Sequence, residues 1–533
     1  MASCEPAARA ALRLWLGFGA MCVGMFMAIL DIQIVASSLT TIGDALDLSK
    51  SQLGWIQTSY LMAEVIAIPL SGLLTRGFSL RWMFAAATFA FTLASIGCAF
   101  SSSLGTLIVC RVAQGLFGGM LIPAVFTAVF TLVPERHRLR ATTLAGVFAL
   151  LAPTFGPVVG GYLTQTQSWH WIFLINIAPG LAVTVLVAAF VRADPPDRTA
   201  LRCLDLFGLA SFASSLALLE LLLNEGPDHH WQGNFIVVTL TACILSGALG
   251  IWRCLTATDP FVDLKRFGNI CFAAGCIFSF VLGLGLFGSI FIMSLFLGLV
   301  REHSPLIIGE ILMVTGMAQL LTAPLSAWAE TRAAPRLLTL LGFGLFGAGL
   351  LANGFLTPQS DFAALFWPQA LRGGALMFCL LPATRLALDI WPAAQVPEAS
   401  ALFNLVRNLG GAIGIALIDT MVDERAGAHV ARLVARLQAG DPVTARFVGL
   451  PVALFHNQPM APVDTMTRMM ITPLIERAAL TQVLNEAWIA LAILFAVSLL
   501  ALPLMARVRS VRPPVPRSWP KGPWRAADQE HRA

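Results

Sequence analysis

Three ionisable residues lie inside long apolar segments, where a charge is energetically costly. Asp31 lies in the first segment, Glu64 in the second and Arg111 in the fourth. An ionisable side chain at the centre of a bilayer costs about 2.5–3.5 kcal/mol on insertion scales, so each needs a partner or a function. Because a carboxyl group in a low-dielectric environment favours its neutral form, it can bind and release protons near neutral pH. We therefore assign proton exchange to Asp31 and Glu64.

Asp31 and Arg111 are expected to lie at similar depth and could form an ion pair. Each lies about seven or eight residues from the same face of the membrane, since their segments run in opposite directions. In this hypothesis Arg111 adjusts the carboxyl group of Asp31. The alternative for any such charge is a static pair that helps the helices assemble. We favour that alternative for Arg407, which lies close to the end of its segment.

One apolar segment contains the stretch Ala-Pro-Thr-Phe-Gly-Pro-Val-Val-Gly-Gly at 152–161. Each proline removes a backbone hydrogen bond, which a membrane helix tolerates when its neighbours satisfy the freed carbonyl. Small residues recur every four positions and form one smooth face, which lets another helix approach closely. We predict a bent helix that moves against a neighbour; the alternative is an ordinary packing helix. The residues with this conformational role are Ala152, Pro153, Gly156, Pro157, Gly160 and Gly161.

The composition is that of a polytopic membrane protein. Of the 533 residues, 57% are hydrophobic and 12% are charged, which is more apolar surface than a soluble protein of this length needs. The first apolar run continues to about Leu39 without a convincing cleavage site, so we interpret it as a span rather than a signal peptide. The net charge of +5 fits arginines on the cytoplasmic side of a lipid bilayer and does not indicate a nucleic-acid partner.

Hydropathy indicates about fourteen spans, and the loop charges predict their orientation. The short loops on one side contain arginines such as Arg332 and Arg336, whereas those on the other side contain little beyond Lys50 and Arg301. The positive-inside rule therefore places both termini in the cytoplasm. The spans are expected to begin near Leu12, Leu53, Trp82, Leu104, Ala141, Trp171, Leu204, Phe235, Ile270, Leu306, Leu337, Phe362, Ala399 and Ala487.

Two parts of the chain carry similar patterns at matching intervals. Arg81 follows Pro69 by twelve residues, and Arg336 follows Pro324 by the same interval. Repeated halves are typical of secondary transporters, which bind substrate near the midplane between the halves. We therefore predict an all-α protein with two six-helix halves. The expected parts are a first half at 1–200, an inserted helix pair at 201–268, a second half at 269–507 and a cytoplasmic tail at 508–533.

One predicted connection, Asp423–Glu486, is much longer than the others and is expected on the periplasmic side. Within it, Val430–Leu437 has the apolar spacing of a short amphipathic helix, whose other side carries Arg432 and Arg436. The apolar side could lie on the membrane surface or form a docking site for a partner.

The sequence contains no motif for a chemical energy source. It has no Gly-x-x-x-x-Gly-Lys-Ser/Thr nucleotide loop, and its eight histidines form no metal-ligand cluster. We therefore predict a transporter rather than an enzyme, without a metal or cofactor, driven by a proton gradient. One charge moving through 100 mV supplies about 2.3 kcal/mol, enough to concentrate a solute roughly tenfold or more per proton.

The sequence resembles the fourteen-helix drug:proton antiporters of the major facilitator superfamily over nearly its whole length. The 152–161 stretch is similar to the antiporter signature in helix 5 of that family, and Arg111, Gln114 and Gly115 match its Arg-x-x-Gln-Gly motif. The resemblance implies the major facilitator fold and a role for Arg111 in proton transfer. Further similar stretches are Leu30-Asp31, Trp169–Asn176 and Asn404–Gly411.

The chain departs from that family at two places. Arg76 stands where the family has an aspartate, and Gln33 and Ser37 stand where it has Thr-x-x-Asn after the aspartate of helix 1. The long periplasmic connection resembles the branch that works with a periplasmic adaptor and an outer-membrane channel, which implies a Gram-negative inner membrane.

We predict a proton-coupled antiporter that exports hydrophobic or amphipathic small molecules, such as antibiotics or toxic metabolites, by alternating access. Its cavity is expected to be largely apolar and rich in Phe and Met. The alternatives are an importer or facilitator of a metabolite, and a non-transporting receptor or scaffold. In either case Asp31 would be only structural. The candidate cavity residues are Gln33, Gln114, Arg372 and Asn404.

Overall fold

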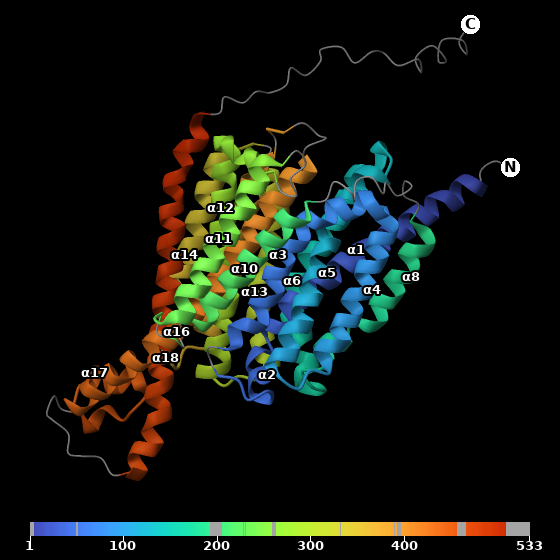
Figure 1. Ribbon diagram of the computed structural model, residues 1–533. Helices are drawn as coiled ribbons and strands as arrows, with labels where there is room; N and C mark the ends of the chain where they lie inside the picture. The colour runs from blue at the N-terminus through green and yellow to red at the C-terminus, as the bar shows by residue number, and fades with distance from the viewer. Residues whose placement is uncertain are drawn as a thin grey trace, which may run out of the picture.

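Long apolar helices run back and forth across the molecule (Figure 1). The computed structural model describes residues 5–49, 52–191, 205–226, 229, 231–257, 263–330, 332–388, 390–391, 396–455 and 465–507. In these ranges, 13 helices are long and apolar enough to cross a membrane, and α3 adds a further apolar helix of 26 residues. The arrangement agrees with the predicted number of spans. The predicted tail at 508–533 lies outside the described residues.

The first half contains six spans that pack closely through glycines. A Cβ atom on Gly119 would lie only 2.7 Å from Cγ of Glu64 on a neighbouring helix, so the two backbones approach where a larger residue would not fit. The helices of this half are α1 (Glu5–Ala36), α2 (Leu39–Ala45), α3 (Leu53–Phe78), α4 (Leu80–Ala99), α5 (Leu104–Thr131), α6 (Glu135–Thr166), α7 (Trp171–Leu174) and α8 (Ile177–Phe190).

The inserted pair consists of α10 (Leu206–Glu225) and α11 (Asn234–Thr256). Asp205, at the start of α10, forms an ion pair of 2.9 Å with Arg253 of α11. The hydrogen bond from Arg253 lowers the pKa of Asp205 below its usual range. Since α10 also contacts both α3 and α16, the pair lies beside the junction of the two halves.

The second half repeats the six-span arrangement. Its long helices are α12 (Ile270–Leu295), α13 (Pro305–Glu330), α14 (Pro335–Asn353), α15 (Phe362–Leu388), α16 (Val396–Gln438) and α18 (Thr465–Ser498). The shorter helical segments are Leu264–Gly268, the π-helical turn Phe296–Val300, α17 (Pro442–Val448), Val452–Leu454 and Leu499–Arg507.

The prediction that Asp423–Glu486 is a loop is wrong over most of its length. α16 is a single helix of 43 residues. At 1.5 Å per residue it is about 65 Å long, roughly twice the thickness of a hydrocarbon core. α18 begins at Thr465, well before the predicted Ala487. Both helices therefore extend beyond the bundle and enclose α17, as the lower left of Figure 1 shows. We call residues 423–455 and 465–486 the α17 subdomain, and this side of the bundle the α17 end.

The amphipathic pattern is confirmed, but its apolar side is covered within the chain itself. Leu433 and Leu437 of α16 pack in a small buried cluster with Val448 of α17 and Ile475 and Ala478 of α18. The apolar side of this helix therefore packs against α17 and α18 and stabilises the subdomain, and it does not face the membrane surface. What the helix leaves exposed is its polar side.

The two halves touch from the α17 end to the middle of the molecule. α6 and α13 run antiparallel, and α3 packs on α16. A Cβ atom on Gly161 of α6 would lie 2.7 Å from Cα of Leu306 on α13, and one on Gly309 would lie 2.9 Å from Cα of Val158. Nearer the middle, Thr154 donates a hydrogen bond of 3.2 Å to the carbonyl of Gly316. Backbone-to-backbone contact therefore joins the halves at this end.

Candidate functional site

A cavity lies between the two halves, near the middle of α6 and α13. Its volume is about 30 Å³, the space of roughly one water molecule in this closed arrangement, and its wall is mostly apolar, as predicted. The prediction of a wall rich in Phe and Met is wrong, because neither residue type lines it. Of the candidate cavity residues, Gln33 lies on the wall. The full lining is Gln33, Pro153, Pro157, Leu286, Ile290, Leu312, Thr315, Gly316, Gln319 and Leu376.

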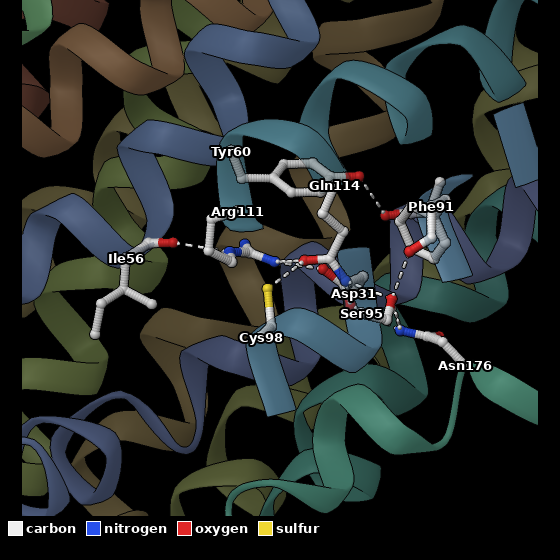
Figure 2. Close-up of polar contacts among 10 residues, drawn as sticks. Asp31, Ile56, Tyr60, Phe91, Ser95, Cys98, Arg111, Gln114 and Asn176 are labelled. Atoms are coloured by element: carbon white, nitrogen blue, oxygen red, sulfur yellow. Dashed lines mark hydrogen bonds and ion pairs between the residues drawn. The ribbon is translucent and has the colours of Figure 1, made fainter. Parts of the chain in front are cut away.

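Asp31 and Arg111 form the predicted ion pair, within the first half. Nη1 of Arg111 lies 2.5 Å from Oδ2 of Asp31, and each residue is only 1% exposed. The other oxygen of Asp31 accepts hydrogen bonds of 2.9 Å from Gln114 and from Asn176 (Figure 2). Ser95 accepts a further bond of 2.8 Å from Gln114. The carboxyl group is therefore surrounded by donors and sealed from the central cavity.

Four spans bring this network together. Asp31 comes from α1 and Ser95 from α4, while Arg111 and Gln114 occupy one side of α5, three residues apart. Asn176 is the residue at which α8 begins. Because the network is assembled from four helices of the first half, movement of any one of them would change the surroundings of the carboxyl group.

α3 closes the network from the other side. Nε of Arg111 donates a hydrogen bond of 3.0 Å to the carbonyl of Ile56, and its guanidinium lies 4.5 Å from the centre of the Tyr60 ring. The hydroxyl of Tyr60 donates to the carbonyl of Ala28 on α1, 3.2 Å away. Figure 2 shows the ring of Tyr60 lying beside Arg111 and Gln114. Tyr60 is 1% exposed, so the ion pair is covered by an aromatic ring.

Glu64 lies one turn further along α3 and faces the second half. It is 1% exposed and lies near Asn408 and the positive charge of Arg407, both on α16. One of its oxygens, Oε2, has no hydrogen-bond partner. The prediction that Arg407 belongs to a static pair is still a prediction. Its acidic neighbour, however, is on the opposite half, so the interaction crosses the interface that alternating access would have to open.

The remaining cavity candidates lie away from the cavity wall. Gln114 belongs to the network around Asp31. Asn404 donates to the carbonyl of Ser400 one turn earlier on α16, at 2.9 Å. Arg372 is buried behind Thr315, which does line the cavity. Direct contact with substrate is therefore supported for Gln33 alone among the four predicted residues.

The small residues of α6 are divided between two neighbours. A Cβ atom on Gly156 would lie 2.6 Å from Cβ of Gln33, and one on Gly160 would lie 2.7 Å from Oγ of Ser37, so this face packs on α1. Ala152, on the same face, is fully buried. Since α1 belongs to the same half, this face packs within the first half, and the conformational role of these residues stays a prediction. The contact with the other half is made by the adjacent face, which carries Pro153, Pro157 and Gly161.

Gly156→Leu should reduce transport severely, because the leucine would have to displace Gln33 and with it α1. Overpacking of this kind typically costs about 1–3 kcal/mol, and here it would also shift the helix that carries Asp31. Gly146→Leu is the matched control on the same helix, since no neighbouring atom lies within 4 Å of a Cβ at that position. The measurement is export per folded protein in whole cells. Equal export by the two variants would mean that close packing of α6 on α1 is not required.

Several polar residues of the site carried no functional assignment from the sequence. Ser95 is a single polar residue in an apolar segment, Tyr60 follows three polar residues, and Asn408 lies in the stretch Asn404–Gly411; many residues in such settings only pack. Asn176 was noted only as part of a motif. The sequence feature that relates to Tyr60 is the pair of glycines on α5, Gly115 and Gly118. Both lie directly against Tyr60 in the structure. That spacing indicates a close helix but does not identify the residue on it.

Comparison with known proteins agrees with this arrangement. A family model for the Major Facilitator Superfamily matches residues 21–415. The chain is 39% identical over 420 residues to the colistin resistance protein EmrB of Acinetobacter baumannii, covering 79% of this chain and 82% of that protein. It is 30% identical over 426 residues to the multidrug export protein EmrB of Escherichia coli K12, covering 79% and 83%.

Solved structures support the same fold. A bacterial homolog of the human lysosomal transporter Spinster, in an inward-facing and occupied conformation, matches with a TM-score of 0.61 at 14% identity, over 92% of this chain and 96% of that one. A D-xylose–proton symporter matches with a TM-score of 0.58 at 14% identity, over 87% and 96%. At these identities the likeness concerns the fold alone. The chain belongs to the Major Facilitator Superfamily and, within it, to the family of the EmrB proteins.

Proposed function

We propose that this protein is a proton-coupled exporter of hydrophobic or amphipathic small molecules in a bacterial inner membrane. The observation that carries the proposal is the position of Glu64, a buried carboxyl group of the first half that interacts with Asn408 and Arg407 of the second. A change of its protonation state alters the attraction between the halves. Proton binding is thereby coupled to the movement that opens and closes the cavity.

The direction of coupling follows from the charges. When Glu64 is ionised, its attraction to Arg407 holds α3 against α16 and favours the closed interface. When Glu64 is protonated, that attraction is lost and the interface opens more easily. α17 is assigned to the periplasmic side, and the α3–α16 interface opens toward that side. Protons would therefore reach Glu64 from the periplasm.

The network around Asp31 acts as a second proton site in this proposal. Protonation of Asp31 would free Arg111 from its only acidic partner among the described residues. The guanidinium would then be held by Oε1 of Gln114, 2.7 Å away, and by the Ile56 carbonyl and the Tyr60 ring of α3. α3 also carries Glu64, so the two carboxyl groups are connected through one helix.

The cavity is suited to apolar compounds with one or two polar groups. Its wall offers Gln33, Gln319 and Thr315 among aliphatic residues and contains no charge. A wall of this kind holds ligands mainly through burial of apolar surface, which tolerates different shapes. The relatives' names, which mention multidrug export and colistin resistance, support a substrate class of this kind.

The proposal is tested by efflux of a panel of compounds from cells that lack their own pumps. Expression should lower the accumulation of amphipathic and hydrophobic compounds, and a proton ionophore should restore it. Strongly polar metabolites of similar size should be unaffected. Uptake of a single metabolite, independent of the proton gradient, would instead identify an importer or facilitator.

We also propose that the α17 subdomain binds a periplasmic adaptor that leads to an outer-membrane channel. A groove along the subdomain is lined by Arg432 and Arg436, with His429 and Glu486 at its base. The two arginines are exposed, while Leu433 between them is buried in the subdomain and Val434 partly so. An adaptor should therefore bind through acidic and polar groups, which adds orientation and specificity more than raw affinity.

Reversing both charges, Arg432→Glu with Arg436→Glu, should abolish resistance in cells with an outer membrane. The same variant should still transport in reconstituted vesicles, since the cavity is far from the groove. A charge reversal is sharper than deletion of Ala426–Leu450, because the deletion would uncover the buried cluster. Cross-linking from either position to a periplasmic protein is the direct measurement. Full resistance with no cross-linked partner would mean that the pump works alone.

A further inference from the structure

A buried arginine in the second half lacks an acidic partner among the described residues. Arg372 of α15 is 1% exposed, and its hydrogen-bond partners are the neutral side chains of Gln369 and Thr315. Its Nη1 makes no hydrogen bond. A guanidinium cannot lose its proton in a protein, so a buried one costs free energy unless a negative charge lies nearby. In the first half, Arg111 meets this requirement with Asp31.

Unpaired N–H groups surround this arginine. Nε2 of Gln369, Nδ2 of Asn353 and Nε1 of Trp488 all lack a hydrogen-bond partner, as does the acceptor Oδ1 of Asn353, and all three residues are fully buried. The guanidinium of Arg372 lies 5.2 Å from the centre of the Trp488 ring. Each unsatisfied buried polar group costs free energy. Four unpaired donors in one region, counting Nη1 of Arg372, therefore indicate a bound group that accepts hydrogen bonds.

The helices place these residues on facing sides. A Cβ atom on Gly349 of α14 would lie 3.2 Å from Cβ of Arg372, and Asn353 is one turn further along the same side of α14. Trp488 comes from α18, which packs on α14. Three helices of the second half therefore contribute unpaired donors to the region around Arg372.

We infer that Arg372, Gln369, Asn353 and Trp488 form a binding site for one small inorganic anion of about the size of chloride. A positive charge with several N–H donors suits an anion rather than a cation. All four residues are sealed, with exposures of 0–1%, and none lies on the wall of the central cavity, so an ion fits better than a larger group. Thr315 donates a hydrogen bond of 2.9 Å to Gln369 and also lines the cavity, so one residue separates the site from the cavity. The inference does not depend on proton coupling.

A carboxylate on a transported compound would offer the same chemistry. To reach Arg372 it would have to pass Thr315 and open the contact between α13 and α15, where Gly373 lies directly against Thr315. The burial therefore favours a free ion. The bound anion would connect α14, α15 and α18, so it should stabilise the second half of the protein.

The test measures the unfolding temperature of the purified full-length protein in sodium chloride and in sodium gluconate at equal ionic strength. Chloride should raise the unfolding temperature with a saturable dependence on concentration, and gluconate, which is too large for the site, should not. Trp488→Phe keeps an aromatic ring beside the guanidinium and removes one donor. It should raise the half-saturating chloride concentration about tenfold, as expected for a lost hydrogen bond to a charged group.

Arg446→Gln is the matched control, because Arg446 is exposed on α17 and its removal changes the net charge by the same amount as Arg372→Gln. It should keep the wild-type response to chloride, whereas Arg372→Gln should lose it. If Arg372→Gln does not fold, Trp488→Phe and Asn353→Leu decide the question. Equal stabilisation by both salts, or an unchanged chloride response in Trp488→Phe, would overturn the inference. Selective loss of export of carboxylated compounds without any chloride dependence would also overturn it and assign the site to substrate.

Discussion

Asp31→Asn should abolish proton-driven export while leaving the protein in the membrane. The substitution keeps the size of the side chain but removes the only acidic partner that the described residues offer to Arg111. Breaking a buried ion pair on one side typically costs about 3–5 kcal/mol, so reduced stability is expected as well as lost activity. Export of a fluorescent cation should fall to the level of cells without the protein. A normal rate of export would make Asp31 merely structural.

A double variant separates the two effects of this substitution. Asp31→Asn with Arg111→Gln removes both charges and leaves a neutral network that Gln114 and Asn176 can still bridge. It should regain the unfolding temperature of the wild type but not proton-driven export. Exchange of labelled for unlabelled substrate, without a proton gradient, should continue in this variant. Recovery of full proton-driven export would show that the pair serves assembly alone.

Glu64→Gln should uncouple export from the proton gradient and should damage export of cationic compounds more than neutral ones. Glutamine keeps the size of the side chain beside Asn408 but cannot attract Arg407 across the interface. A carboxylate near the midplane can also neutralise a cation that enters the cavity. The measurement compares export of a cationic and a neutral compound of similar size, at several external pH values.

Glu424→Gln provides the control for this substitution, because Glu424 is exposed on α16 outside the interface. It should leave export of both compounds and its pH dependence unchanged. Equal loss for both compounds in Glu64→Gln would assign the residue to proton handling alone. Undiminished export of both would remove Glu64 from the site.

The architecture could be predicted from the sequence because membrane helices are specified locally. A span needs about 20 apolar residues, and this length, the loop charges and the repeated Pro–Arg interval are all visible without a structure. The boundaries of α16 and α18 could not be predicted in this way. Outside the membrane a helix is set by packing, and the partners of Leu433 lie on α17 and α18, far along the chain.

The site was predictable where an ionisable residue lies at an unfavourable depth. That argument singled out Asp31, Glu64 and Arg111. It also predicted, from their similar depth, that Asp31 and Arg111 form an ion pair. It could not decide which side of a helix faces which neighbour, so the packing of the smooth face of α6 on α1 was not predictable. Nor could it show that Glu64 faces Asn408 and Arg407, because that interaction joins residues of opposite halves.

The central claim is that export by this protein is coupled to protons through a carboxyl group at the interface of the halves. The most direct measurement uses purified protein in vesicles with an acidic, dye-containing lumen, to which an amphipathic cation such as ethidium is added. Ethidium entry should be accompanied by a rise of lumenal pH, and both should disappear in Glu64→Gln but not in Glu424→Gln. Ethidium accumulation without any pH change, and insensitive to a proton ionophore, would contradict the account.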